Sequence, residues 1–474
     1  MGLCLSIHLL LLLQDPGLFE ERRLAVLPDD IEPDAVYFSP DGRRVSFSVR
    51  DGSRGWMVVD GKKGDVVDWT SSLKYSPESK LVAYWVAVMG RYAVVTGDQR
   101  GEWFEQGSEI VFCADGKTVM YSGMQGGKRF LVTGAKREEF DGDRQIHIVP
   151  SPDGKSIAVA GRQTGKLRTF LDGQRKGEKD DEAFDPKFSD DGSIFAYAVT
   201  AAGKSSWIVG GLRGDPFDEV GPLTFSPDGK SFAYSAGEQG VGSYVVVGVR
   251  KGKTYGYIPT PHITFSPDGK AVAYAAMTNG KVRMVIGEKE GEEFDETQYP
   301  CFSPDGKKVA YAARIGDRWR MVVGERKEES FLRVQWPVFS PDGSSVTYLA
   351  LRHDGYILVA GGKVMDGLGV AHPPYLFSPA GKLAFRSEKE GKERVFVDGR
   401  KGEEFERVSG LCMSPRGKVL YRGQKGKAGH LVVGDKSFEE LDPCTWPVFS
   451  PDGRRAALGV RQGRELWWKV VTLD

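Results

Sequence analysis

Phe302-Ser303-Pro304-Asp305-Gly306 is one of twelve related stretches that recur along this 474-residue chain. The sequence Phe-Ser-Pro-Asp-Gly begins at Phe38, Phe225, Phe265, Phe302, Phe339 and Phe449. Divergent copies begin at Tyr75, Phe112, Pro150, Phe188, Phe377 and Met413. Successive copies begin 36 to 40 residues apart. A fixed period of this length is typical of a repeat architecture.

The repeat that begins at Tyr299 contains four short runs rich in Val, Tyr and Phe, at residues 299–302, 309–313, 320–323 and 329–334. Turns that contain glycine separate them, so we expect four antiparallel strands joined by hairpins. Proline presets the backbone of the first turn, and glycine supplies its left-handed residue. Ser-Pro-Asp-Gly is therefore interpreted as a structural turn rather than a catalytic Ser-Asp pair.

A single four-stranded sheet cannot bury both of its faces, so each sheet must pack against its neighbours. Radial packing of such sheets is a β-propeller. The sequence predicts an all-β protein with twelve four-stranded blades, arranged as two six-bladed propellers or, alternatively, as one twelve-bladed ring. The expected domains are a leader at 1–20 and propellers at 21–251 and 252–474. Residues 22–27 form a spare strand, expected to close the sixth blade of the first ring, with residues 254–258 closing the twelfth blade.

Three repeats extend the turn sequence with Lys and a later Ala-Tyr pair: Lys230 with Ala233-Tyr234, Lys270 with Ala273-Tyr274, and Lys307 with Ala310-Tyr311. This unit resembles the WD40-like propeller repeats of the TolB type, and the resemblance covers about residues 22–474. It implies the propeller fold and leaves the function open. The extra α/β domain of TolB and the hydrolase domain of the prolyl-oligopeptidase group have no counterpart in the chain, so we do not expect their activities.

Composition excludes some partners. The 65 basic and 65 acidic residues balance, so we expect no nucleic-acid partner. The apolar segment 3–13 is too short to span a membrane and resembles a secretory signal. It predicts a periplasmic or extracellular protein, with a cytoplasmic location as the alternative. The cysteines follow neither a disulfide nor a zinc pattern, and we expect no cofactor and no metal.

The chain carries no nucleophile elbow, phosphate-binding loop or zinc-protease motif, so we predict no catalytic residues. Candidate binding residues lie three positions before the aromatic residue of each turn, where the first strand is expected to line a central channel. Glu109, His147 and Asp185 occupy this position in three successive repeats, with Lys74 and Lys187 close by. These groups would converge at the channel mouth of the first propeller and hold a metal or a small polar ligand. The alternative is that they are solvated channel residues.

The same position in the second half of the chain is aromatic in character. It holds His262, Tyr299, Trp336 and Trp446. These side chains would form a mouth suited to a peptide or a sugar, and the alternative is aromatic packing between strands.

Two functions are compatible with these features. The first is a non-enzymatic TolB-like scaffold that binds protein or peptide partners. The second is an enzyme of the lyase or hydrolase type with a polar or metal site at Glu109, His147 and Asp185. The whole-chain repeat and the lack of a catalytic motif favour the scaffold.

Overall fold

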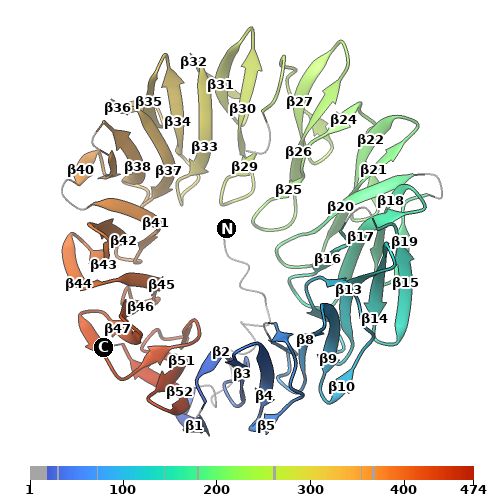
Figure 1. Ribbon diagram of the computed structural model, residues 1–474. Coiled ribbons are helices and arrows are strands. Elements are labelled where there is room, and N and C mark those ends of the chain that lie inside the picture. Colours follow the sequence, from blue (N-terminus) through green and yellow to red (C-terminus); the bar gives the residue numbers. More distant parts are fainter. Residues whose placement is uncertain are drawn as a thin grey trace. The chain divides into compact units, whose positions relative to one another are not determined.

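The computed structural model of the chain describes residues 19–28, 31–71, 73–142, 145–178, 181–259, 263–353, 355–365 and 369–473. These residues form twelve antiparallel sheets and no α-helix, which confirms the predicted all-β propeller of twelve blades. The chain falls into two compact units, residues 1–201 with 439–474 and residues 202–438. Within each unit, consecutive sheets lie side by side (Figure 1). The predicted domains and the number of rings stay predictions.

The first unit contains five complete sheets and the first two strands of a sixth. Its strands are β1 (Arg22–Val26), β2 (Pro33–Phe38), β3 (Val45–Asp51), β4 (Arg54–Val59), β5 (Lys62–Lys63), β6 (Trp69–Thr70), β7 (Lys74–Tyr75), β8 (Val82–Val88), β9 (Arg91–Thr96), β10 (Gln99–Arg100), β11 (Gln106–Gly107), β12 (Val111–Phe112), β13 (Val119–Gln125), β14 (Lys128–Thr133), β15 (Lys136–Phe140), β16 (His147–Pro150), β17 (Ile157–Gln163), β18 (Lys166–Leu171), β19 (Gln174–Lys176), β20 (Glu182–Phe188), β21 (Phe195–Ala201), β49 (Asp442–Pro443), β50 (Val448–Phe449), β51 (Arg455–Gln462) and β52 (Glu465–Thr472).

The second unit holds the other strands. They are β22 (Lys204–Val209), β23 (Leu212–Arg213), β24 (Glu219–Val220), β25 (Thr224–Phe225), β26 (Phe232–Glu238), β27 (Gly242–Val247), β28 (Arg250–Lys251), β29 (Thr264–Phe265), β30 (Val272–Thr278), β31 (Lys281–Ile286), β32 (Lys289–Phe294), β33 (Glu296–Phe302), β34 (Val309–Ile315), β35 (Arg318–Val323), β36 (Arg326–Phe331), β37 (Arg333–Phe339), β38 (Val346–Arg352), β39 (Gly355–Ala360), β40 (Lys363–Met365), β41 (Val370–Phe377), β42 (Leu383–Lys389), β43 (Lys392–Val397), β44 (Arg400–Phe405), β45 (Arg407–Met413), β46 (Val419–Lys425), β47 (Ala428–Val433) and β48 (Lys436–Phe438).

The spare strand at the start of the chain completes the last sheet. β1 pairs antiparallel with β52, so that Arg22 lies opposite Trp468, and the sheet order is β1-β52-β51-β49. The expected pairing of residues 22–27 with the sixth blade is therefore wrong. Residues 254–258 do not close the last sheet either, because Tyr255 bridges to Ser243 and Tyr257 bridges to Met277. The pairing of β1 covers the otherwise open edge of β52.

The Ser-Pro-Asp-Gly stretches are the turns between the first two strands of the sheets, as the sequence predicts. After β2, the Ser39 hydroxyl donates to the Asp41 carboxylate at 2.6 Å and accepts from the Arg44 amide at 2.9 Å. The Gly42 amide donates to the Ser39 carbonyl at 2.9 Å, and Gly42 takes a φ of 65°. Glycine is favoured there because a Cβ makes the left-handed region costly.

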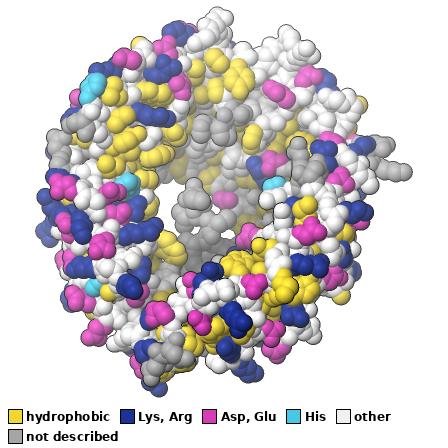
Figure 2. Space-filling view, in the orientation of Figure 1, with side chains coloured by type: hydrophobic (Ala, Val, Ile, Leu, Met, Phe, Trp, Pro, Cys, Tyr) yellow, Lys and Arg dark blue, Asp and Glu magenta, His cyan; other side chains and the backbone are white. Residues whose placement is uncertain are grey.

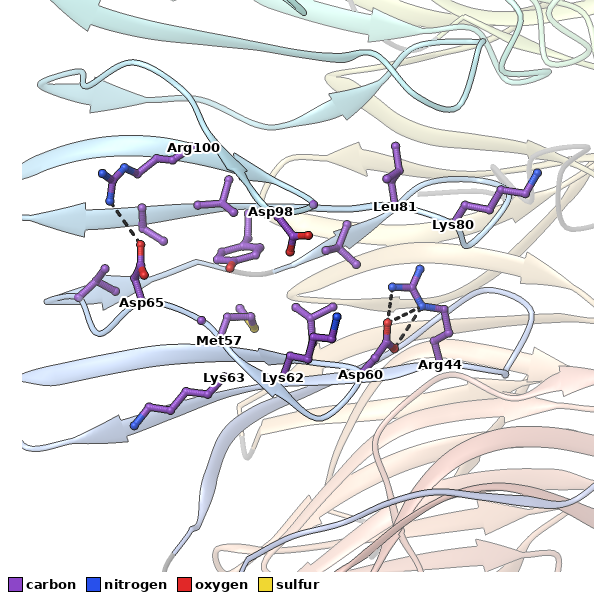
Figure 3. Close-up of a pocket in the computed structure, with 18 residues that line it drawn as sticks. Arg44, Met57, Asp60, Lys62, Lys63, Asp65, Lys80, Leu81, Asp98 and Arg100 are labelled. Carbon is purple, nitrogen blue, oxygen red and sulfur yellow. Dashed lines mark hydrogen bonds and ion pairs between the residues drawn. The ribbon is translucent and has the colours of Figure 1, made fainter.

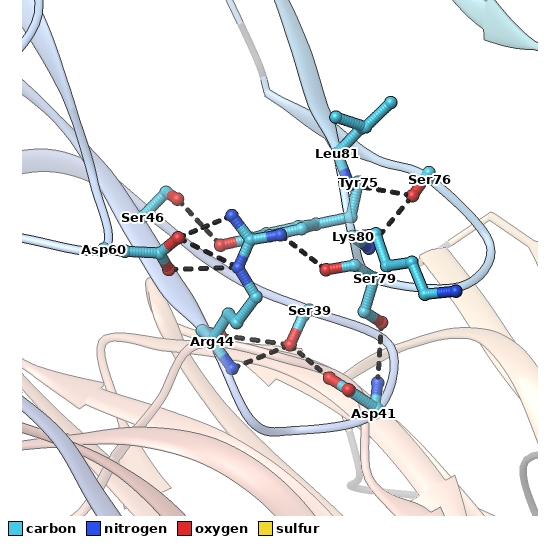
Figure 4. A network of polar contacts seen from close by, with 10 residues as sticks. All are labelled: Ser39, Asp41, Arg44, Ser46, Asp60, Tyr75, Ser76, Ser79, Lys80 and Leu81. Carbon is cyan, nitrogen blue, oxygen red and sulfur yellow. Dashed lines mark hydrogen bonds and ion pairs between the residues drawn. The ribbon is translucent and has the colours of Figure 1, made fainter. Parts of the chain in front are cut away.

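This turn also binds the turn of the neighbouring sheet (Figure 4). The Arg44 guanidinium donates to the Ser79 carbonyl at 2.5 Å, and the Asp41 amide donates to the Ser79 hydroxyl at 3.3 Å. The hydroxyls of Ser46 and Tyr75 lie 2.7 Å apart. Polar contacts thus join neighbouring sheets where these turns meet.

Six sheets bury a ring at their outer side. In these sheets the fourth strand, or the segment after it, ends in a ring that is at most 2% exposed; these rings are Phe104, Phe140, Phe217, Phe294, Phe331 and Phe405. Phe294 packs with Val309 and Tyr311 of the next sheet. Phe302, directly before its turn, joins the same cluster but is only half-buried. The aromatic residue before the turn therefore lies between sheets, as expected, and the ring from the outer strand buries more.

Charged residues cover the exposed fourth strands. Lys62, Lys136, Arg326 and Arg400 begin four of these strands and are exposed, and such charges discourage pairing with another chain. Basic and acidic side chains are interspersed over the face in Figure 2. Ion pairs join neighbouring sheets, for example Arg137 with Glu102 at 2.5 Å. An exposed pair of this kind contributes about 0–1 kcal/mol.

We predict that the turns make the fold sensitive to acid. A hydrogen bond from the turn serine lowers the pKa of seven aspartates, Asp153, Asp191, Asp228, Asp268, Asp305, Asp342 and Asp452. The pKa of Asp342 falls to about 2. Because the folded pKa lies below the unfolded value of about 3.9, this stabilisation is present above pH ~4 and is lost as the pH falls toward 2. The urea midpoint should drop over that interval.

The matched variants are Asp342→Asn and Asp317→Asn. Asp342→Asn should flatten part of the acid slope, whereas Asp317→Asn, in the hairpin between β34 and β35, should leave it unchanged. A urea midpoint that stays constant from pH 5 to pH 2 would contradict this account of the turns.

Candidate functional site

The predicted binding position coincides with an interruption of the first strand in most sheets. The register of the first strand shifts around Asp185, Tyr299, Trp336 and Gly410. In four other sheets the first strand is split, and three of the gaps contain Glu109, Pro222 and Trp446. Residues at such interruptions leave the hydrogen-bond ladder, so their side chains can vary without disturbing the sheet.

Three of these residues adopt a backbone conformation that their side chains disfavour. Asp185 has a φ of 52°, and Tyr299 and Trp336 each have a φ of 55°. Gly410, at the same position of β45, has a φ of 65° without that cost. A bulky residue with positive φ is an outlier and costs about 1–2 kcal/mol.

A sequence signal for these bulges was available. Asp185, Tyr299 and Trp336 are each followed by a proline. Proline has no amide hydrogen to donate to the ladder, so within sheets it occurs at edges and bulges. The proline predicts that the strand is interrupted here, although it does not reveal the sign of φ.

Two ion pairs join members of the first predicted cluster. The Lys74 ammonium lies 3.2 Å from the Glu109 carboxylate, and both groups are exposed. Lys187 pairs with Asp185 of its own strand at 3.6 Å, and His147 is the exposed first residue of β16. In the described part of the chain, no three His, Cys, Asp or Glu side chains form a group that could hold a metal ion. Glu109, His147 and Asp185 therefore do not form the metal site of the enzyme hypothesis.

The second predicted cluster is described only in part. Tyr299 and Trp336 occupy equivalent bulges on β33 and β37, which are in contact within the second unit. Trp336 is 41% exposed, and Tyr299 is half-buried against the cluster that contains Phe339. Trp446 is 66% exposed and belongs to the first unit. His262 lies outside the described residues.

Clefts between neighbouring sheets were not predicted. One, of about 520 Å³, lies between the sheets β2–β5 and β6–β10 (Figure 3). Two ion pairs neutralise much of its charge, Arg44 with Asp60 at 2.5 Å and Arg100 with Asp65 at 3.4 Å. Tyr84 lines this cleft, and its hydroxyl is directed toward Gly64, where a Cβ would come within 3.4 Å of it. Burial raises the pKa of Tyr84, so the ring stays neutral and fills space between the sheets.

The remaining chemistry of the described residues is limited. Cys113, Cys301 and Cys412 are free thiols. Burial raises the pKa of Cys301 and of Cys412 to about 12, so neither is a nucleophile at neutral pH. The described part of the chain has no helix long and apolar enough to cross a membrane.

Comparison with known proteins identifies no family for the chain. No family model and no curated protein sequence matches the chain. Similar solved structures include a eukaryotic initiation factor, with 14% identity, a TM-score of 0.34 and coverage of 66% of this chain and 90% of that one. The β-propeller domain of the Trilobed protease from Pyrococcus furiosus shares 16% identity, with a TM-score of 0.29 and coverage of 54% and 96%. TolB from Acinetobacter baumannii shares 15%, with a TM-score of 0.24 and coverage of 63% and 79%. These similarities assign no function.

The bulge conformation predicts an unusual order of stability at Asp185. Asp185→Gly should be more stable than Asp185→Ala by about 1–2 kcal/mol, because alanine keeps the Cβ that opposes a positive φ. At Lys74, within the regular strand β7, alanine should be more stable than glycine by about 0.5–1 kcal/mol. Urea denaturation of the four variants measures both differences. If the alanine variant were the more stable one at both positions, Asp185 would not be held in the left-handed region.

Proposed function

We propose that this protein is a non-enzymatic β-propeller scaffold with TolB-type repeats, which binds a peptide segment of a partner protein. The bulges of β33 and β37 form the centre of the proposed site. The observation that carries the proposal is that Tyr299 and Trp336 keep large aromatic side chains in a left-handed backbone conformation. Such strain persists where the surrounding structure imposes it, and it clusters at binding sites.

Stability alone does not account for these two aromatic residues. Gly410 occupies the equivalent bulge of β45 without the steric cost. Trp336 also leaves 41% of its surface exposed, so part of its apolar area contributes nothing to folding. Tyr and Trp are enriched in protein interfaces because they bring large contact areas with few rotatable bonds. Two such residues on contacting strands form a surface suited to apolar side chains of a peptide.

The test uses peptides selected from a random display library on the purified full chain. Trp336→Gly and Tyr299→Gly should each weaken binding of the selected peptides by at least tenfold, which corresponds to about 1.4 kcal/mol. Trp69→Ala is the control, because Trp69 is 39% exposed but lies on β6 of the other unit. Selected peptides that bind both glycine variants as tightly as the parent chain would rule out this site.

We also propose export to the periplasm or the cell surface. The support is the apolar segment 3–13, whose length matches the core of a secretory signal and which lies outside the described residues. N-terminal sequencing of the protein made by its native cell should show a mature chain that begins near residue 20. A mature chain that retains Leu3–Leu13 would argue for the cytoplasmic alternative.

A further inference from the structure

Two consecutive turns depart from the charge pattern of the repeat. The fourth residue of the repeated stretch is Asp or Glu in ten of its twelve copies. The two exceptions are Ala380, in the turn between β41 and β42, and Arg416, in the turn between β45 and β46. Both side chains are exposed. One turn has therefore lost its carboxylate, and the next carries a guanidinium in its place.

The geometry of the turn does not account for the change of charge. In the usual turn the serine hydroxyl donates to the carboxylate, as Ser303 does to Asp305 at 2.6 Å. The two exceptional turns are one residue shorter, and their serine hydroxyls accept from a backbone amide at 3.0 Å. Ala380 shows that the shortened turn accepts an uncharged side chain, so the turn does not require an arginine at position 416.

The exceptional turns lie against each other. A Cβ added at Gly417 would come within 2.6 Å of the Cβ of Ser378, in the preceding turn. In each sheet the turn between the third and fourth strands lies beside the first turn and is held by a backbone hydrogen bond of 2.7 or 2.8 Å; these bonds run from the Asp398 amide to Leu383 and from the Gly434 amide to Val419. The four turns therefore form one continuous surface at this end of β41–β44 and β45–β48.

Basic residues dominate this basic turn surface. It consists of six basic and two acidic residues, with a net charge of +4; these are Lys382, Arg400, Lys401, Arg416, Lys418, Lys436, Asp398 and Asp435. All the basic side chains except that of Lys418 are exposed, and within the described chain these five form no ion pair. The next acidic residue of β44, Glu403, already pairs with Lys425. The positive charge of the surface is therefore not compensated by the chain itself.

We propose that the basic turn surface binds an acidic segment of a partner protein. Carboxylates of the segment pair with Arg416 and with the exposed lysines beside it. Alternate side chains of an extended segment lie on one face, about 7 Å apart, so that several carboxylates reach the surface together.

The acidic residues of the surface favour a protein segment over a nucleic acid. Asp398 and Asp435 interrupt the positive charge, and separate carboxylates avoid them more easily than a continuous row of phosphates does. The zero net charge of the chain also provides no wider attraction for a long polyanion. The surface lies on other sheets than the peptide site at Tyr299 and Trp336, and binding at either place is tested without the other.

Fluorescence anisotropy of the full chain with three labelled probes tests the proposal. The probes are a peptide of alternating glutamate and serine about eight residues long, the lysine–serine counterpart, and a thymidine oligonucleotide of similar length. The glutamate peptide should bind saturably at about 50 mM salt and at least fivefold more weakly at about 300 mM, because salt screens exposed charges. The lysine peptide should not bind. No saturable binding of the glutamate peptide, or tighter binding of the oligonucleotide, would overturn the proposal.

Variants that restore the usual carboxylate locate the binding. Arg416→Asp should weaken binding of the glutamate peptide about tenfold and Ala380→Asp about threefold, since they change the local charge by two units and by one. Lys230→Asp is the matched control, because Lys230 is exposed in the turn between β25 and β26 of the same unit and the charge change equals that of Arg416→Asp.

The control variant should bind the glutamate peptide as the parent chain does. Equal losses in Lys230→Asp and Arg416→Asp would reflect the total charge of the protein and overturn the proposal. Should Arg416→Asp fail to fold, Arg416→Ala removes the charge with the side chain that the preceding turn already carries at Ala380, and it should weaken binding at least threefold.

Discussion

Each sheet of this protein is too thin to bury its own side chains, and burial by the neighbouring sheet is the constraint on which the structure depends. Phe405 illustrates it. The ring is 1% exposed, and a Cβ added at Gly423 of the next sheet would come within 2.3 Å of it. The same arrangement joins Phe104 to Gly123 and Phe140 to Gly161. A ring in one sheet and a glycine in the next are therefore selected as a pair by close packing.

This constraint leaves two places where a side chain is free to change. One is the interruption of the first strand, where residues have left the hydrogen-bond ladder and Asp185, Tyr299 and Gly410 all fit the same backbone. The other is a position on the second strand that holds tyrosine in eight sheets, as at Tyr84, and Val159 in β17, where Phe170 of the next strand lies opposite it. The peptide site proposed at Tyr299 and Trp336 uses the first of these places, so its side chains are added without loss of the packing that holds the sheets together.

The strands, the turns and the character of the candidate position could be predicted from the chain alone. The turn pattern places proline, aspartate and glycine where a tight hairpin requires them, and Ser39, Asp41 and Gly42 form the expected contacts. The polar candidates were placed on the correct strands, but Glu109, His147 and Asp185 do not form a metal site. Glu109 pairs with Lys74 of the preceding sheet. The pairing of charged side chains depends on the directions in which they point, and the spacing of the repeats does not specify those directions.

The periodic sequence by itself determined that the chain builds twelve small antiparallel sheets, because strand length, turn chemistry and alternation of buried residues are local properties. Only the tertiary structure decided that Arg22 lies opposite Trp468 and that four first strands of the described chain bend through a positive φ. Every sheet presents similar edges and faces, so local sequence cannot choose among them. The choice is made when distant segments compete to cover the same edge or fill the same space.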